Sequence, residues 1–166
     1  MKIEFILNSS FAKAAKKIGV KKSTCVGIIG FNSPEYFFSL QGTWLLGAVT
    51  VGVYTTNAPD ACVYVLNHSE CSICVCQGGD QAKKIYGIRN ELPHLKAIVV
   101  YWPDEGMPED DGKGGAKVYR WEDFIATGTD ISDDEIVADA KKVEPGSCAT
   151  LIYTSGTTVL YCIFPA

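Results

Sequence analysis

The segment from residue 154 to residue 158 offers four side-chain hydroxyl groups around a single glycine. Hydroxyls and successive backbone N–H groups donate hydrogen bonds to anionic oxygens, and glycine lets the backbone come close to a phosphate. The run before it, residues 149–153, has the apolar and β-branched character of a strand. Composition alone is more typical of a polar turn, but the arrangement also fits a phosphate-binding loop made of Thr154, Ser155, Gly156, Thr157 and Thr158.

Two other kinds of site, a zinc site and a hydrolase nucleophile, have weaker support in the sequence. His68, Cys71, Cys74 and Cys76 fall within nine residues, and four N/S ligands suit tetrahedral zinc. However, Cys74 and Cys76 would lie on one face of a strand, no second ligand pair follows, and structural cysteines are commonly buried. Ser155 lies in Thr-Ser-Gly and not in the Gly-x-Ser-x-Gly pattern of a hydrolase nucleophile. We therefore predict neither a metal site nor a catalytic residue in this chain.

The segments that must position the loop alternate between strand and helix patterns. Short apolar runs predict strands at residues 25–30, 48–54, 72–76 and 95–101, and a short edge strand at 118–121. Helical patterns cover residues 11–18 after a Ser9 or Ser10 cap, 34–46 after Ser33, 59–67, 80–91 after a Gly78-Gly79 turn, and 133–142 after Ser132. This alternation indicates an α/β fold with a mostly parallel sheet and flanking helices.

Composition narrows the class of protein. The chain has 166 residues, about one domain, and a net charge of −4, which disfavours nucleic acid as a partner. Seven cysteines, an odd number, favour free thiols in a reducing compartment.

Residues 36–54 carry no charge, but their glycines and β-branched residues predict helix, turn and strand and not a transmembrane span. We expect a cytoplasmic protein, compatible with peripheral attachment to a membrane.

The order of the residues around the hydroxyl-rich loop is more specific than its composition. The sequence Tyr-Thr-Ser-Gly-Thr-Thr at residues 153–158 resembles the phosphate-binding signature of the adenylate-forming superfamily. Three further segments resemble the bubblegum-type long-chain fatty acyl-CoA synthetases: residues 30–36, 52–57 and 95–98. The resemblance extends from about Phe11 to Thr158, which is most of the chain.

The resemblance implies a two-step reaction. A fatty acid carboxylate attacks the α-phosphorus of ATP in the presence of Mg²⁺, which gives an acyl-adenylate and releases pyrophosphate. The thiol of coenzyme A then attacks the acyl carbon and displaces AMP. Fatty acid, ATP and coenzyme A are therefore the implied partners. Residues 154–158 would contact the β- and γ-phosphates of ATP, whose developing charge such a site must neutralise.

The chain departs from the family immediately after this loop. The family continues with glycine, a variable residue, proline and lysine, whereas this chain has Val159, Leu160, Tyr161 and Cys162. We expect residues 1–158 to be the N-terminal part of an AMP-binding domain, residues 159–166 to be a divergent apolar tail, and the family's C-terminal domain to be absent. A chain of this kind is predicted to bind nucleotide weakly and to be inactive alone. The alternatives are a non-catalytic binding or regulatory isoform, and an unproductive fragment from an incorrect gene model.

Overall fold

The computed structural model describes residues 2–104, 106–112, 115–154 and 162–163. Its strands are β1 (Cys25–Ile29), β2 (Val49–Val53), β3 (Cys71–Gln77), β4 (Ala97–Tyr101), β5 (Lys117–Arg120), β6 (Thr150–Tyr153) and β7 (Cys162–Ile163). Its helices are α1 (Lys2–Ile18), α2 (Pro34–Leu45), α3 (Pro59–His68), α4 (Gly78–Gly87), α5 (Trp121–Ala126) and α6 (Asp133–Ala140), with a 3₁₀ turn, η1 (Arg89–Glu91).

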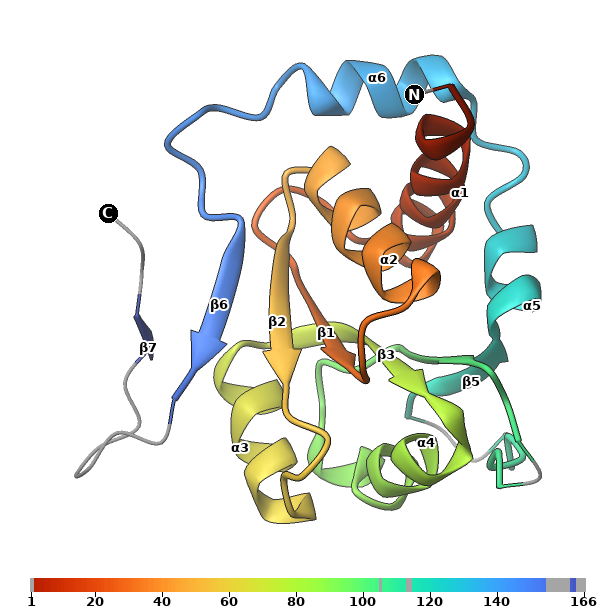
Figure 1. The fold of residues 1–166 in the computed structure, drawn as a ribbon, viewed down its shortest axis with the longest axis vertical. Coiled ribbons are helices and arrows are strands. Elements are labelled where there is room, and N and C mark those ends of the chain that lie inside the picture. Colours follow the sequence, from red (N-terminus) through yellow and green to blue (C-terminus); the bar gives the residue numbers. More distant parts are fainter. Residues whose placement is uncertain (1, 105, 113–114, 155–161, 164–166) are drawn as a thin grey trace.

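The strands form one seven-stranded sheet in the order β5-β4-β3-β1-β2-β6-β7 (Figure 1). All neighbouring strands from β5 to β6 run parallel, and β7 pairs antiparallel with β6. The predicted α/β fold with a mostly parallel sheet is therefore confirmed. Every residue of β1 and β4 is buried, because helices cover both faces of the sheet, and this explains their continuous apolar sequences.

Two clusters of buried side chains lie on opposite faces of the sheet. One contains residues of α3 and α4, among them Cys62, Leu66 and Ile85. The other contains residues of α1, α5 and α6, among them Phe11 and Phe124. The result is a three-layer arrangement in which the sheet lies between the two groups of helices (Figure 1).

Two helix starts agree with the sequence expectation. Ser33 caps α2, and its Oγ accepts a hydrogen bond of 3.0 Å from the backbone N–H of Tyr36. Ser132 and Glu135 form a capping box at the start of α6. The span without charge at residues 36–54 becomes most of α2, a turn and β2. Among the described residues, no helix has the length and apolar character needed to cross a bilayer.

Two expected helix starts are wrong. Helix α1 begins at Lys2, so Ser9 and Ser10 are not its caps; the Ser9 side chain is buried within the helix and donates to the Asp133 carboxylate at 3.1 Å. Gly78 and Gly79 do not form a separate turn before a helix, because α4 begins at Gly78 directly after β3. The Asp104 carboxylate accepts a 2.9 Å hydrogen bond from the Gly79 N–H, and this long-range contact stabilises the helix start.

The lysines of α1 make contacts that the sequence did not predict. The Nζ of Lys13 lies 2.9 Å from Asp133, and that of Lys16 lies 2.8 Å from Asp139. Lys17 pairs with Asp130. These ion pairs connect α1 to α6 and to the residues just before it, more than a hundred positions later in the chain.

These ion pairs make the free energy of unfolding depend on pH in the acidic range. Hydrogen bonds from Lys142 and Lys16 hold the pKa of Asp139 below its usual 3.8, and bonds from Lys13 and Ser9 lower the pKa of Asp133 from the same value. Because the folded-state pKa values are depressed below the usual 3.8, the stabilisation is complete above about pH 5 and is lost as pH falls through the folded values.

We expect the free energy of unfolding, measured with urea, to fall as the pH is lowered from about 5 to about 3. The variant Asp139→Asn should show a weaker pH dependence than the wild type, because it cannot lose that carboxylate's ion pairs. Equal pH dependence in both proteins would contradict a contribution from this residue.

Candidate functional site

The candidate site begins with β6, which pairs with β2 in the sheet. Thr50 pairs with Thr150, and their side-chain hydroxyls lie 3.1 Å apart. The indole N–H of Trp44 donates to the Ala149 carbonyl at 2.7 Å, and the Thr50 N–H donates to the same carbonyl at 3.0 Å. The start of β6 is therefore held both by the strand ladder and by a side chain of α2.

The carboxyl end of β6 lies at the same edge of the sheet as the carboxyl ends of β1, β2 and β3, since these strands are parallel. In open α/β sheets, ligands bind in the crevice outside this edge. Thr154 follows β6 at this edge. The other four predicted phosphate ligands, Ser155, Gly156, Thr157 and Thr158, lie outside the described residues, so the loop as a binding site stays a prediction.

A cavity of about 470 Å³ opens beside Thr154. Its lining includes Tyr54 and Asn57 from the β2–α3 turn, Tyr64 from α3, and Tyr153 from β6. This volume lies in the range of small-molecule sites, and the walls combine aromatic rings with a few polar groups. Thr154 itself is part of the lining.

Three rings in and beside this cavity pack on one another. Tyr64 and His68 stack with centroids 5.6 Å apart and an interplanar angle of 12°. Tyr153 packs edge-on against both, at 6.3 Å and 5.8 Å. Its hydroxyl and the Nδ1 of His68 lie 2.8 Å apart in a hydrogen bond. Sequence reasoning missed this cluster; the four-residue spacing of Tyr64 and His68 on a helix is the one local signal for it.

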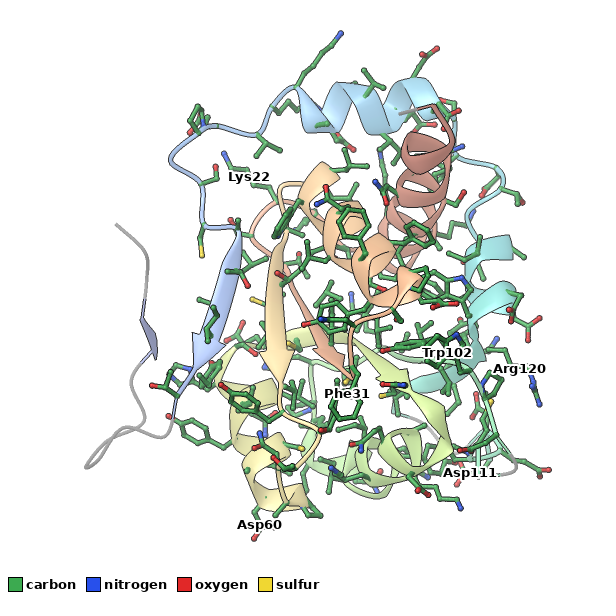
Figure 2. The ribbon with its side chains drawn as sticks, viewed as in Figure 1. Lys22, Phe31, Asp60, Trp102, Asp111 and Arg120 are labelled. Carbon is green, nitrogen blue, oxygen red and sulfur yellow. The ribbon has the colours of Figure 1, made fainter. Side chains whose placement is uncertain are left out.

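A second cavity at the same edge, of about 330 Å³, lies between Phe31 and Trp102 (Figure 2). Both side chains are exposed, and the Phe31 N–H donates to the Gln77 side chain at 2.6 Å. The N-terminus of α4 faces this cavity with its Gly79 N–H already bonded to Asp104. A carboxylate of the protein therefore occupies the position that an anion would take there.

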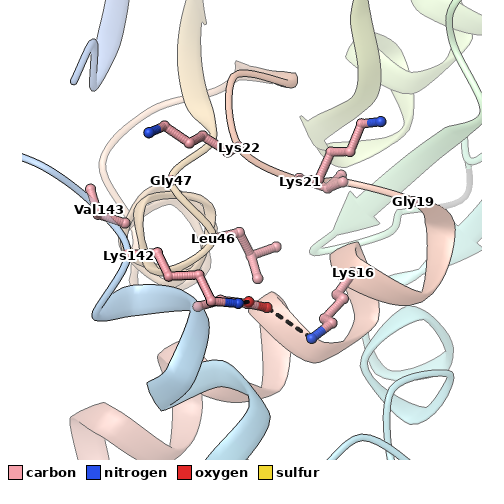
Figure 3. Close-up of a pocket in the computed structure, with 10 residues that line it drawn as sticks. Lys16, Gly19, Lys21, Lys22, Leu46, Gly47, Lys142 and Val143 are labelled. Carbon is pink, nitrogen blue, oxygen red and sulfur yellow. Dashed lines mark hydrogen bonds and ion pairs between the residues drawn. The ribbon is translucent and has the colours of Figure 1, made fainter.

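Another cavity, of about 480 Å³, lies where the chain enters β1 and β2, at the opposite edge of the sheet. Figure 3 shows the residues that line it. Lys16, Lys21, Lys22 and Lys142 line it, and Lys22 precedes β1 at the far end from Phe31 (Figure 2). Lys16 and Lys142 each contact Asp139 at 2.8 Å (Figure 3 marks the contact of Lys16). Helices α1, α2 and α6 all end near this cavity, and cations stabilise helix C-termini. These contacts give Lys16 and Lys142 a structural role away from the candidate site.

The cysteines of β3 are structural. Cys74 and Cys76 are fully buried on one face of the strand, with their sulfurs 3.8 Å apart. Burial raises the pKa of the Cys71 thiol in β3 well above its usual value, and it raises that of Cys25, in the neighbouring strand β1, to about 11. Both thiols therefore stay protonated at neutral pH. Within the described part of the chain, no group of three or more His, Cys, Asp or Glu side chains is arranged to bind a metal ion.

Comparison with known proteins connects this geometry to a family. The sequence matches the family described as "AMP-binding enzyme" over residues 8–159. The chain belongs to the AMP-binding enzyme family. Two of the segments that resemble this family, residues 30–36 and 52–57, form the β1–α2 and β2–α3 connections at the edge that carries Thr154. The third, residues 95–98, lies at the opposite end, where β4 begins.

Individual relatives within the AMP-binding family support the assignment. The long-chain-fatty-acid–CoA ligase ACSBG1 of Rattus norvegicus is 37% identical over 154 residues, which cover 93% of this chain and 20% of that ligase. The ligase ACSBG2 of Xenopus laevis is 40% identical over 149 residues, or 89% of this chain and 19% of the relative. The chain thus spans about a fifth of the length of these curated relatives.

The fold of the chain is also that of solved AMP-binding enzymes. The structure of a long-chain-fatty-acid-CoA ligase from Archaeoglobus fulgidus superposes with a TM-score of 0.72, over 97% of this chain and 28% of that one. The two sequences are 15% identical, so this likeness concerns the fold. It confirms that the expected α/β architecture is part of the adenylate-forming fold.

Proposed function

We propose that this chain forms the N-terminal part of the AMP-binding domain of a long-chain fatty acid–CoA ligase. The observation that carries the proposal is the position of Thr154, at the carboxyl edge of a parallel sheet and beside a cavity of about 470 Å³. The 37% identity to a long-chain-fatty-acid–CoA ligase supports the choice of a fatty acid as substrate. In this proposal residues 1–158 belong to the AMP-binding domain and residues 159–166 are a divergent tail.

Residues 154–158 would hold the β- and γ-phosphates of ATP. The described donor set fits this role in part, because Thr154 supplies a hydroxyl beside the cavity. ATP would supply the activated phosphorus that a carboxylate attacks, with coenzyme A as the final acyl acceptor. Mg²⁺ typically binds through substrate phosphates and one or two carboxylates, so the proposal requires no all-protein metal cluster.

The present chain is proposed to be inactive by itself. In the family, a lysine near the loop balances phosphate charge, and here Val159 to Cys162 contribute no cation. A charge-assisted hydrogen bond contributes about 1.5–3 kcal/mol, so its absence leaves the polyphosphate weakly bound. No residue of the chain is assigned a catalytic role.

A chimeric enzyme tests the proposed function. Residues 8–158 would replace the matching segment of the Rattus norvegicus ligase, and palmitate-dependent ATP–pyrophosphate exchange would be measured. We expect the chimera to catalyse exchange, and the 166-residue chain alone to show none. A chimera that also carries Ser155→Ala and Thr157→Ala should lose activity by roughly 10²-fold or more, as for the removal of positioned donors.

Two results would count against the proposal. A folded chimera without exchange activity would contradict the assignment of this segment to a ligase. Clear exchange by the isolated chain would contradict its proposed inactivity.

A further inference from the structure

The cavity of about 330 Å³ at the start of α4 has an acidic lining. The carboxylates of Asp80 and Asp104 line it, and no described lysine or arginine does. Neither carboxylate forms an ion pair with a residue that the structure describes. The ammonium group of Lys84 in α4 donates instead to the carbonyls of Thr55 and Asn57, both at 2.9 Å. The cavity therefore carries two negative charges that no described ion pair neutralises.

The start of α4 disfavours an anion in this cavity. Helix N-termini commonly bind anions through unpaired N–H groups. Here the Oδ1 of Asp104 accepts hydrogen bonds from the Gly79 N–H at 2.9 Å and from the Gly106 N–H at 3.0 Å. A Cβ atom at Gly79 would overlap this oxygen, so glycine is what lets the carboxylate come so close. The protein supplies its own anion at the helix start, and the negative field beside it favours a cationic ligand.

Two large aromatic side chains are exposed beside these charges (Figure 2). Phe31 is 70% exposed and Trp102 is 52% exposed. Trp102 also has a φ of 50°, in the left-handed region that bulky residues rarely adopt. Its indole N–H donates to the Glu35 carboxylate at 3.1 Å, which sets the direction of the ring. Core packing does not explain a strained backbone at an exposed ring, and such strain is concentrated at functional sites.

We propose that this cavity binds a guanidinium group, such as the side chain of an arginine in a partner protein. The flat face of a guanidinium stacks on aromatic rings, and its N–H groups donate to carboxylates in a fork. Phe31 and Trp102 supply the rings, while Asp80 and the Oδ2 of Asp104 supply the acceptors. An uncharged ligand would gain nothing from the two carboxylates, and an anionic one would be repelled by them. The site is separate from residues 154–158.

A titration with an arginine derivative and its neutral counterpart tests this proposal. The ¹⁵N-labelled 166-residue chain would be titrated with N-acetylarginine methylamide, and the amide NMR signals of Phe31 and Gly79 would be followed. We expect these signals to shift with a dissociation constant on the order of 10 mM, as for one exposed ion pair combined with one cation–π contact. N-acetylcitrulline methylamide has nearly the same shape without the charge, and it should bind about tenfold more weakly.

Matched variants locate the site. Asp80→Asn should weaken binding of the arginine derivative about threefold, the usual effect of one exposed carboxylate. Asp60→Asn makes the same charge change at another exposed residue, at the start of α3 and outside the lining of the cavity, and should leave binding unchanged (Figure 2).

Trp102→Gly separates binding from stability. It should weaken binding at least about threefold, because it removes one of the two rings. Its urea midpoint should not fall, because glycine relieves the left-handed backbone while the ring that it removes is half exposed. A purely structural role for Trp102 predicts a lower urea midpoint with binding unchanged, and that result would contradict the proposal.

Two probes identify the source of the guanidinium group. Agmatine represents a free metabolite, and an alanine pentapeptide with arginine at its centre represents a partner protein. Tighter binding of the peptide assigns the site to a protein arginine, whereas tighter binding of agmatine assigns it to a small molecule.

Three results would overturn the guanidinium site itself. These are equal binding of the arginine and citrulline derivatives, equal weakening by Asp60→Asn and Asp80→Asn, and the absence of any shift at Phe31 and Gly79 up to about 100 mM of the arginine derivative. None of these measurements depends on residues 154–158, so failure of this proposal and failure of the proposed function are distinguishable.

Discussion

The substitution Phe11→Ala is expected to lower the free energy of unfolding by about 3–5 kcal/mol, the usual cost of removing a large aromatic side chain from a core. Phe11 is fully buried, stacks on Trp121 at 5.7 Å and contacts Phe124 at 5.5 Å. A Cβ atom added at Gly42 of α2 would lie 2.9 Å from the Phe11 ring, so three helices meet at this side chain. Since α1, α2 and α5 contribute to the contact, the cavity left behind has little freedom to collapse.

The matched control is Phe37→Ala on α2. Phe37 is 48% exposed, and its described ring contact is with its neighbour Phe38 at 6.3 Å. Surface substitutions of this kind change stability by about 0.5 kcal/mol or less. Urea denaturation followed by circular dichroism measures both variants. Similar losses in the two would show that the α1–α2–α5 contact is not a main part of the core.

The second large expected effect is a gain in affinity for magnesium ATP when the lysine that follows the phosphate loop in the family is introduced into this chain. The triple variant Val159→Gly, Tyr161→Pro and Cys162→Lys restores the glycine, proline and lysine that the family has after its phosphate loop. In β7, Cys162 pairs with Tyr153, so this position lies beside the strand end that leads to Thr154. A charge-assisted hydrogen bond of about 1.5–3 kcal/mol should raise the affinity for magnesium ATP roughly 10- to 100-fold.

A neutral control isolates the role of the charge. The variant Val159→Gly, Tyr161→Pro and Cys162→Gln makes the same backbone changes without the ammonium group. Isothermal titration calorimetry at two ionic strengths should show a gain in affinity for magnesium ATP in the lysine triple variant and none in the glutamine triple variant. The gain should be smaller at high salt. An equal gain in the glutamine control would mean that backbone geometry, and not the absent cation, limits binding.

Local sequence signals predicted the fold well where the relevant physics is local. The caps at Ser33 and Ser132 act within one helical turn, and the uninterrupted apolar runs of β1 and β4 report burial on both faces. Strand order was not predicted, because β6 pairs with β2 through contacts between residues about one hundred positions apart. Such pairing depends on tertiary packing, for which a single sequence carries little signal.

The errors also have long-range causes. The start of α4 depends on Asp104, whose carboxylate accepts a hydrogen bond from the Gly79 N–H. The two residues are 25 positions apart in the sequence. The lysines of α1 gain their carboxylate partners only when α6 and the residues before it pack against α1. For the candidate site, the loop motif identified the family, whereas the ring cluster behind it required the structure because Tyr153 and His68 are 85 residues apart.

The most direct test of the account is a titration of the 166-residue chain with magnesium ATP, followed by its amide NMR signals. The account predicts that the signals of residues 154–158 shift, with a dissociation constant on the order of 1 mM or weaker, and that Gly156→Ala abolishes these shifts. The absence of any shift at these residues would contradict the phosphate site. Micromolar affinity without the restored lysine would contradict the claim that this loop lacks its essential cation.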